Sequence, residues 1–130
     1  MLNRVLLSAF LVGAVAAASM VEFVPAQAQT SAPPRAYYVA DFELKDPEGI
    51  KPYAAGTPAT LEPYGGRFVA RGGRIAALEG QAPGARSVII EFPSMEQALA
   101  WYNSDAYKAL RPIRQKSGIS RTFIIEALPN

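Results

Sequence analysis

The chain has 130 residues, no cysteine, no histidine and a formal net charge of +2. Without cysteine the sequence excludes disulfides, thiolate nucleophiles and cysteine-ligated zinc, and without histidine it excludes a Ser-His-Asp triad. With 50% hydrophobic and 18% charged residues, the composition is that of one globular domain, and so small a charge does not indicate nucleic acid as a partner.

The first 28 residues are typical of a secretory signal. A basic start, Met1 to Arg4, precedes the apolar run Val5 to Ala18, which is shorter than the roughly 20 residues that span a bilayer. Ala26-Gln27-Ala28 matches an A-x-A cleavage pattern. We therefore predict a signal peptide over residues 1–28, cleavage near Ala28, and a periplasmic or secreted protein with no stable membrane anchor. A retained anchor is the alternative, and residues 29–35 predict a flexible lead-in.

The next segment predicts a strand, a proline-interrupted helix and a second strand. Tyr38 and Phe42 belong to an apolar face that alternates with a polar one, which is the period of a strand. Asp46 is suited to capping a helix, and Gly65 is suited to ending it. The predicted elements are a strand over 37–44, a helix from Asp46 toward Tyr64, a strand over 67–71 and an extended return over 74–79.

The last segment predicts a strand, two helical pieces and a final strand. Ser94 and Gln97 have the spacing of a capping box. Behind them, apolar residues recur at helical spacing: Met95, Ala98, Leu99 and Tyr102. The predicted elements are a strand over 87–92, a helix from Ser94, a second helical segment through Tyr107 and Leu110, and a strand over 122–128.

This order predicts one α+β domain over residues 36–128, a ferredoxin-like βαββαβ fold with a four-stranded antiparallel sheet and the helices on one face. Tyr38 and Ile90 are expected to meet the helices. The opposite face is expected to show β-branched side chains that do not favour water: Val39, Val69, Ile89 and Ile124. We therefore predict a homodimer through the open sheet face, with the two sheets enclosing a barrel.

The segment Tyr-Gly-Gly-Arg-Phe-Val-Ala-Arg-Gly-Gly at residues 64–73 resembles the bacterial family called domain of unknown function 1330. Residues 88–94, 101–104, Tyr107 and Arg114 agree with it. That family is similar to the dimeric α+β barrels, which include cofactor-free monooxygenases and haem-degrading enzymes. The resemblance implies the barrel dimer and carries over no catalytic residues. An export signal departs from the shorter, cytoplasmic members expected of the family.

Aromatic and cationic side chains gather around the break between the two helical pieces. Tyr102, Tyr107, Arg111 and Arg114 predict a pocket for a small anionic or aromatic ligand, with core packing as the alternative. Arg71 is expected to share a strand face with Arg67, where the pair serves as an anion clamp or neutralises carboxylates on other strands.

Three carboxylates, Asp41, Glu91 and Glu126, are expected on the face opposite the helices. Asp41 and Glu91 would lie on the two central strands, where close approach would raise one pKa and create an acid–base pair. The alternative is that they neutralise arginines across the sheet. No cofactor is expected, and no loop has the ligand spacing of a metal site.

These observations predict an exported small-molecule-binding dimeric barrel protein. If the protein is an enzyme, the barrel resemblance implies a cofactor-free oxygenase or isomerase. The alternative is a non-catalytic interaction module whose function is the dimer itself.

Overall fold

The computed structural model of the protein describes residues 12–22 and 31–129. Residues 12–22 contain no helix or strand. The rest of the predicted signal segment, its Ala26-Gln27-Ala28 site and the start of the lead-in lie outside the described residues. Within the described part of the chain, no helix combines the length and apolar character needed to cross a membrane.

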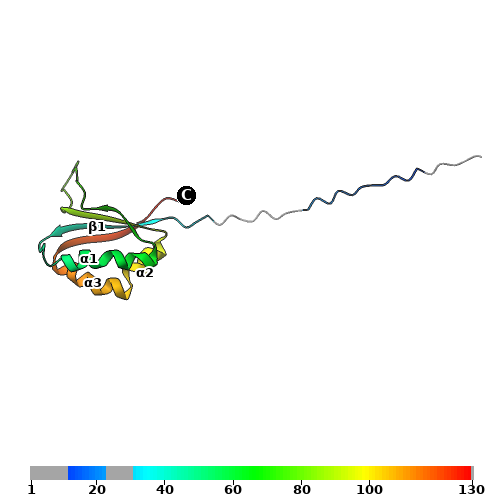
Figure 1. The fold of residues 1–130 in the computed structure, drawn as a ribbon. Helices are drawn as coiled ribbons and strands as arrows, with labels where there is room; N and C mark the ends of the chain where they lie inside the picture. Colours follow the sequence, from blue (N-terminus) through cyan, green and yellow to red (C-terminus); the bar gives the residue numbers. More distant parts are fainter. Residues whose placement is uncertain (1–11, 23–30, 130) are drawn as a thin grey trace, which may run out of the picture.

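Four antiparallel strands form one sheet, and all helices lie on one side of it (Figure 1). The sheet order β2-β3-β1-β4 places the first and third strands at the centre, as the ferredoxin-like prediction requires. The elements are β1 Ala36–Leu44, α1 Lys51–Leu61, the 3-10 helix η1 Glu62–Tyr64, β2 Arg67–Arg71, β3 Arg86–Phe92, α2 Met95–Tyr102, α3 Asp105–Lys116 and β4 Gly118–Glu126.

The alternation of β1 decides which sheet face is covered. Tyr38 and Phe42 are buried beneath the helices, whereas Val39 and Asp41 face the opposite side. Because paired residues of antiparallel strands point to the same face, Ile90 follows Tyr38 onto the helix side. The predicted parity of these two central strands is therefore confirmed.

Trp101 is the centre of the core. Its ring centroid lies 4.0 Å from that of Tyr107, 5.1 Å from that of Tyr38 and 5.2 Å from that of Phe92. The indole nitrogen donates to Thr60 Oγ1 of α1 at 2.9 Å. A single side chain thus joins α1, α2, α3 and the two central strands, with its only polar atom satisfied.

The first helix begins later than predicted, whereas its end agrees with the prediction. The helix begins at Lys51, because Asp46 closes a turn instead, its Oδ1 accepting the Gly49 N–H at 2.9 Å. Pro52 then lies in the first turn, where its missing N–H costs nothing. Gly65 ends the helical segment with φ 66°, as predicted. The capping of α2 by Ser94, which accepts from the Gln97 N–H, is also confirmed.

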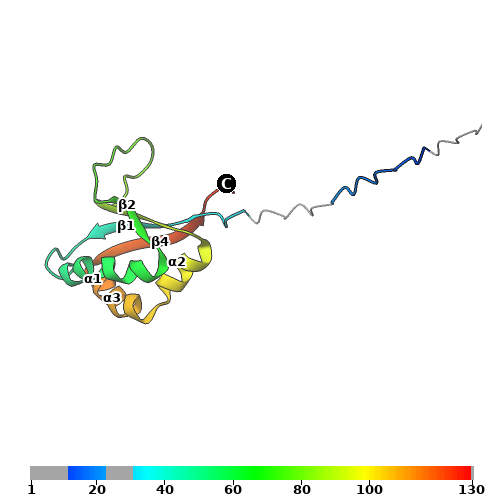
Figure 2. The same cartoon turned by 45° about the vertical axis from the view of Figure 1, so that its right-hand side comes forward.

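Residues 74–79 form no strand, contrary to the expectation of an extended return. They belong to the loop 72–85, which extends away from the helices (Figure 2). This segment is exposed and pairs with no strand, so nothing holds it in a ladder. The final strand also begins earlier than predicted, at Gly118, because its first residues pair with the end of β1.

Predicted face assignments on β2 and on β4 are wrong, each because of register. A bulge between Phe68 and Ala70 shifts β2, so that Arg67 pairs with Glu91 on the open face while Arg71 pairs with Val88 on the helix side. The two arginines therefore share no face. On β4, Ile124 pairs with Tyr38 and packs on the core.

The core geometry predicts that Trp101→Ala destabilises the protein by about 3–5 kcal/mol, since it empties the site that joins five elements. Leu99→Ala on the same helix is the control. Leu99 is 46% exposed, so its truncation should cost about 0.5 kcal/mol or less. Urea unfolding at fixed protein concentration measures both, and equal losses would contradict this description of the core.

Candidate functional site

A cavity of about 490 Å³ lies between α1 and the helix side of the sheet. Its volume is within the roughly 300–1,000 Å³ typical of small-molecule sites. Successive rows of the sheet form its floor, and one face of α1 forms its roof. The apolar and small side chains that line it are Tyr38, Ala40, Phe42, Ile50, Ala54, Phe68, Ala85, Val88 and Ile90.

Arg114 brings a buried cation to this cavity. It lies on α3 two helical turns after Tyr107, and only 4% of its surface is exposed. One terminal nitrogen, Nη1, donates to Ser120 Oγ on β4, while Nε has no hydrogen-bond partner among the described residues. Burial alone would lower the Arg114 pKa, but the surrounding oxygens of Tyr38, Tyr107 and Tyr53 raise it. The guanidinium therefore stays charged.

Three tyrosine hydroxyls lie beside this cation. The Tyr107 hydroxyl is 2.8 Å from that of Tyr53 and 3.5 Å from that of Tyr38. Burial raises the pKa of Tyr38 to about 12, and it also raises the pKa of Tyr107. Both phenols are consequently protonated at neutral pH, which suits them to donate hydrogen bonds and not to accept a proton.

Two further arginines lie at the exposed side of the cavity. Arg71 donates to the Ala54 carbonyl oxygen of α1 at 2.9 Å and stacks on Phe68, with its Cζ 4.5 Å from the ring centroid. Arg86 lines the cavity where the 72–85 loop returns to β3. Arg71 thus links the edge strand β2 to α1 at the exposed side of the cavity.

Of the five predicted ligand residues, Arg71 and Arg114 line the cavity. Tyr107 does not line it but is hydrogen-bonded to Tyr53, which does. Tyr102 and Arg111 are not in its lining. They stack on each other instead, the Arg111 Cζ lying 4.4 Å from the Tyr102 ring centroid. Burial raises the pKa of Tyr102, but the hydrogen bond and charge of Arg111 outweigh it and the net pKa is lowered.

The sequence reasoning missed the contribution of α1. Ile50, Tyr53, Ala54 and Thr57 all line the cavity, and their spacing of three, four and seven residues is that of one helix face. That signal was present in the sequence. The three prolines Pro52, Pro58 and Pro63 obscured it, because they indicated an interrupted helix.

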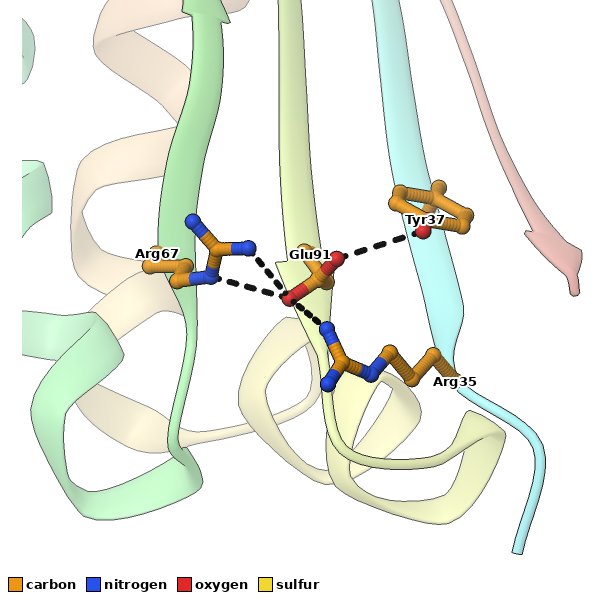
Figure 3. Close-up of polar contacts among 4 residues, drawn as sticks. All are labelled: Arg35, Tyr37, Arg67 and Glu91. Carbon is orange, nitrogen blue, oxygen red and sulfur yellow. Dashed lines mark hydrogen bonds and ion pairs between the residues drawn. The ribbon is translucent and has the colours of Figure 1, made fainter. Parts of the chain in front are cut away.

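Glu91 accepts hydrogen bonds from three side chains on the open face (Figure 3). Arg35 Nη1 and Arg67 Nε each donate to Oε1 at 2.9 Å, and the Tyr37 hydroxyl donates to Oε2 at 3.2 Å. Burial would raise the Glu91 pKa, but these donors outweigh it and lower it below the ordinary 4.5. Glu91 is therefore an ionised structural partner that ties β2 and the chain before β1 to β3.

The other two predicted carboxylates do not join Glu91. Asp41 pairs in register with Ser87, four positions or about 13 Å along the strands from Glu91. It accepts from Arg121 at 2.7 Å and from the Gly84 N–H, and these contacts lower its pKa. Glu126 pairs with Ala36, whose side chain is on the helix side, so the predicted placement of Glu126 on the open face is wrong.

The described residues include no cluster of three metal-binding side chains.

The family described as domain of unknown function (DUF1330) matches residues 35–128. This confirms the resemblance seen in residues 64–73. Among curated proteins, none is significantly similar in sequence.

Several solved structures are similar in fold. A protein of unknown function from Rhodopseudomonas palustris is 18% identical with a TM-score of 0.58, covering 75% of this chain and 85% of that one. A dimeric ferredoxin-like protein of unknown function from Thermobifida fusca is 11% identical with a TM-score of 0.55, covering 76% and 96%. SnoaB, a cofactor-independent oxygenase from Streptomyces nogalater, is 13% identical with a TM-score of 0.53, covering 75% and 96%. At these identities the likeness establishes the fold alone.

The contacts of Glu91 predict a pH-dependent stability. Because its folded pKa is lowered, the stabilisation is complete above the unfolded pKa and is lost as the pH falls through the folded value. Glu91→Gln should therefore cost about 1–2 kcal/mol at pH 7 and close to nothing once the carboxyl is protonated in both states. Urea unfolding at neutral and strongly acidic pH measures the difference.

Glu126→Gln is the matched control, since Glu126 is exposed on the edge strand β4. Its substitution should change stability little at either pH. A Glu91→Gln loss that is the same size at both pH values would contradict the assignment of Glu91 as an ionised partner.

Proposed function

We propose that this chain, which belongs to the family described as domain of unknown function 1330, binds an apolar small molecule in the cavity between α1 and the sheet. The observation that carries the proposal is a cavity of about 490 Å³ with apolar walls and a buried, incompletely bonded arginine at its edge. A concave site of this volume with mostly apolar walls and a few polar groups is typical of small-molecule binding. A cavity of this kind is suited to a ligand.

The cavity is open because small residues occupy positions where the sheet and helix face each other. Ala40 of β1, Ala54 of α1 and Ala85 of the loop line it. The bridge from Arg71 to the Ala54 carbonyl holds α1 and β2 at a fixed separation. These features support a preformed site, because closing it would break that bridge.

Binding is the function that these groups support best. The two tyrosines with raised pKa values are donors at neutral pH, and the cavity lining contains no carboxylate to accept a proton. An oxygenase or isomerase activity would need a proton acceptor from the substrate itself.

We also propose that two copies pair through the open sheet face, as the sequence analysis expected. Three large apolar residues of β4 are exposed on it, Ile119 at 61%, Phe123 at 54% and Ile125 at 54%. Val39 and Ile89 continue this face across the central strands. A second copy would cover an apolar face that is unfavourable in water, and the similar Thermobifida fusca protein is dimeric.

The predicted signal segment supports export, with the mature chain beginning after Ala28.

The cavity predicts that the neutral dye N-phenylnaphthylamine binds saturably and gains fluorescence with the purified protein. Ala54→Trp should abolish binding, because the indole fills the space under α1. Ala55→Trp is the control: it adds the same side chain to the adjacent, exposed position. Dye binding that survives Ala54→Trp, or that is absent from the wild-type protein, would contradict the proposal.

The open face predicts a dimer in native mass spectrometry of the purified protein. Phe123→Glu should yield monomers, because burying an unpaired carboxylate in the apolar interface has a large desolvation cost. Leu78→Glu, in the loop at 90% exposure, should leave the dimer intact. The same spectra give the intact mass, which should correspond to a chain starting at Gln29. A wild-type monomer would contradict the dimer, and a chain that retains residues 1–28 would contradict export.

A further inference from the structure

We infer that the ligand is an apolar monocarboxylate whose carboxylate binds the Nε side of Arg114. This inference rests on the proposed binding function and adds the chemical class of the ligand. Three observations carry it: the unbalanced charge of the cavity, the unpaired Nε–H of one guanidinium, and the apolar character of the remaining walls.

The cavity lining carries positive charge without negative charge. Arg71, Arg86 and Arg114 line it, and no aspartate or glutamate does. None of the ion pairs of the described residues involves Arg114, so no carboxylate lies within 4.0 Å of its guanidinium. Burying a cation without a counter-ion is costly, and a bound anion at this point would offset that cost.

The geometry at Arg114 selects a carboxylate. Nη1 already donates to Ser120 Oγ, whereas the Nε–H has no partner among the described residues although the side chain is almost fully buried. A guanidinium presents its Nε–H parallel to one terminal N–H, and the two together match the two oxygens of a carboxylate. Tyr53, whose ring centroid is 6.0 Å from the Arg114 Cζ, also lines the cavity.

The remaining walls limit the ligand to one buried charge. Phe42, Ile50, Val88 and Ile90 line the same cavity as Arg114 and offer no hydrogen bonds from their side chains. Arg71 is already engaged with Ala54 and Phe68 and is exposed, as is Arg86. A second anionic group held deep in the cavity would therefore be desolvated without a partner. The body of the ligand should be hydrocarbon or aromatic.

The test is competition for bound N-phenylnaphthylamine by matched compounds that differ only in the head group. Phenylbutyrate, phenylhexanoate and phenyloctanoate are each compared with the alcohol and the amine of the same chain. The best acid should bind at least about tenfold more tightly than its alcohol, since a hydrogen-bonded charge pair contributes that much. The amine should bind most weakly, because it would bring a second cation to Arg114.

Variants on α3 then assign the preference to one residue. Arg114→Met keeps much of the volume and removes the donors, so acid and alcohol should bind within about twofold of each other. Arg111→Met, the same substitution one turn earlier on the same helix, should keep the full preference for the acid. Arg114→Lys retains the charge and removes the Nε–H, so its preference for the acid should lie between that of the wild-type protein and that of Arg114→Met. This variant replaces Arg114→Met in the test if Arg114→Met does not fold.

The outcomes separate the two proposals. Absence of saturable dye binding overturns the proposed function and this inference with it. Dye displacement with equal potency by acids and alcohols leaves the binding function standing and overturns the carboxylate assignment. So does a preference that survives removal of the Arg114 guanidinium, or one that Arg111→Met removes equally.

Discussion

The buried guanidinium of Arg114 is the charge around which the helix side of the domain is arranged. Its neighbours are the oxygens of Tyr38, Tyr53, Tyr107 and Ser120 and no carboxylate. Phenol oxygens raise its pKa without neutralising it, so the charge persists in a poorly hydrated place. Trp101 fixes Tyr107 by stacking at 4.0 Å, and Tyr107 in turn holds Tyr53 of α1 by a hydrogen bond. The core therefore positions both the cation and the roof of the cavity next to it.

The two faces of the sheet carry different features because the helices cover only one of them. The covered face holds the cavity and the cation. The open face holds apolar side chains of β4 and the contacts of Glu91, in which two arginines and a tyrosine converge on one carboxylate. This separation allows ligand binding on one face and self-association on the other, with the central strands β1 and β3 shared by both.

Features set by neighbouring residues in the chain were predictable from the sequence. The alternation in β1, the Ser94 cap of α2 and the helix end at Gly65 each follow from local conformational preferences. Arg71 was expected on the wrong face because a bulge depends on how β2 pairs with β3, which no local pattern reveals. The phase of β4 was misjudged because it depends on how β4 pairs with β1, and that pairing places Ile124 and Glu126 on the helix side. Arg114 was a predicted ligand residue, but its burial without a carboxylate partner among the described residues is a tertiary property.

The most direct test of this account is the NMR signal of the Arg114 Nε–H in the purified protein, assigned by its absence from the spectrum of the Arg114→Met variant. Addition of the tightest phenylalkanoate should shift this signal strongly downfield, as expected of an N–H that gains a charged hydrogen-bond acceptor, while the Arg111 Nε–H signal stays in place. The matching alcohol should leave the Arg114 signal nearly unchanged. An acid that binds without moving the Arg114 signal would contradict the account.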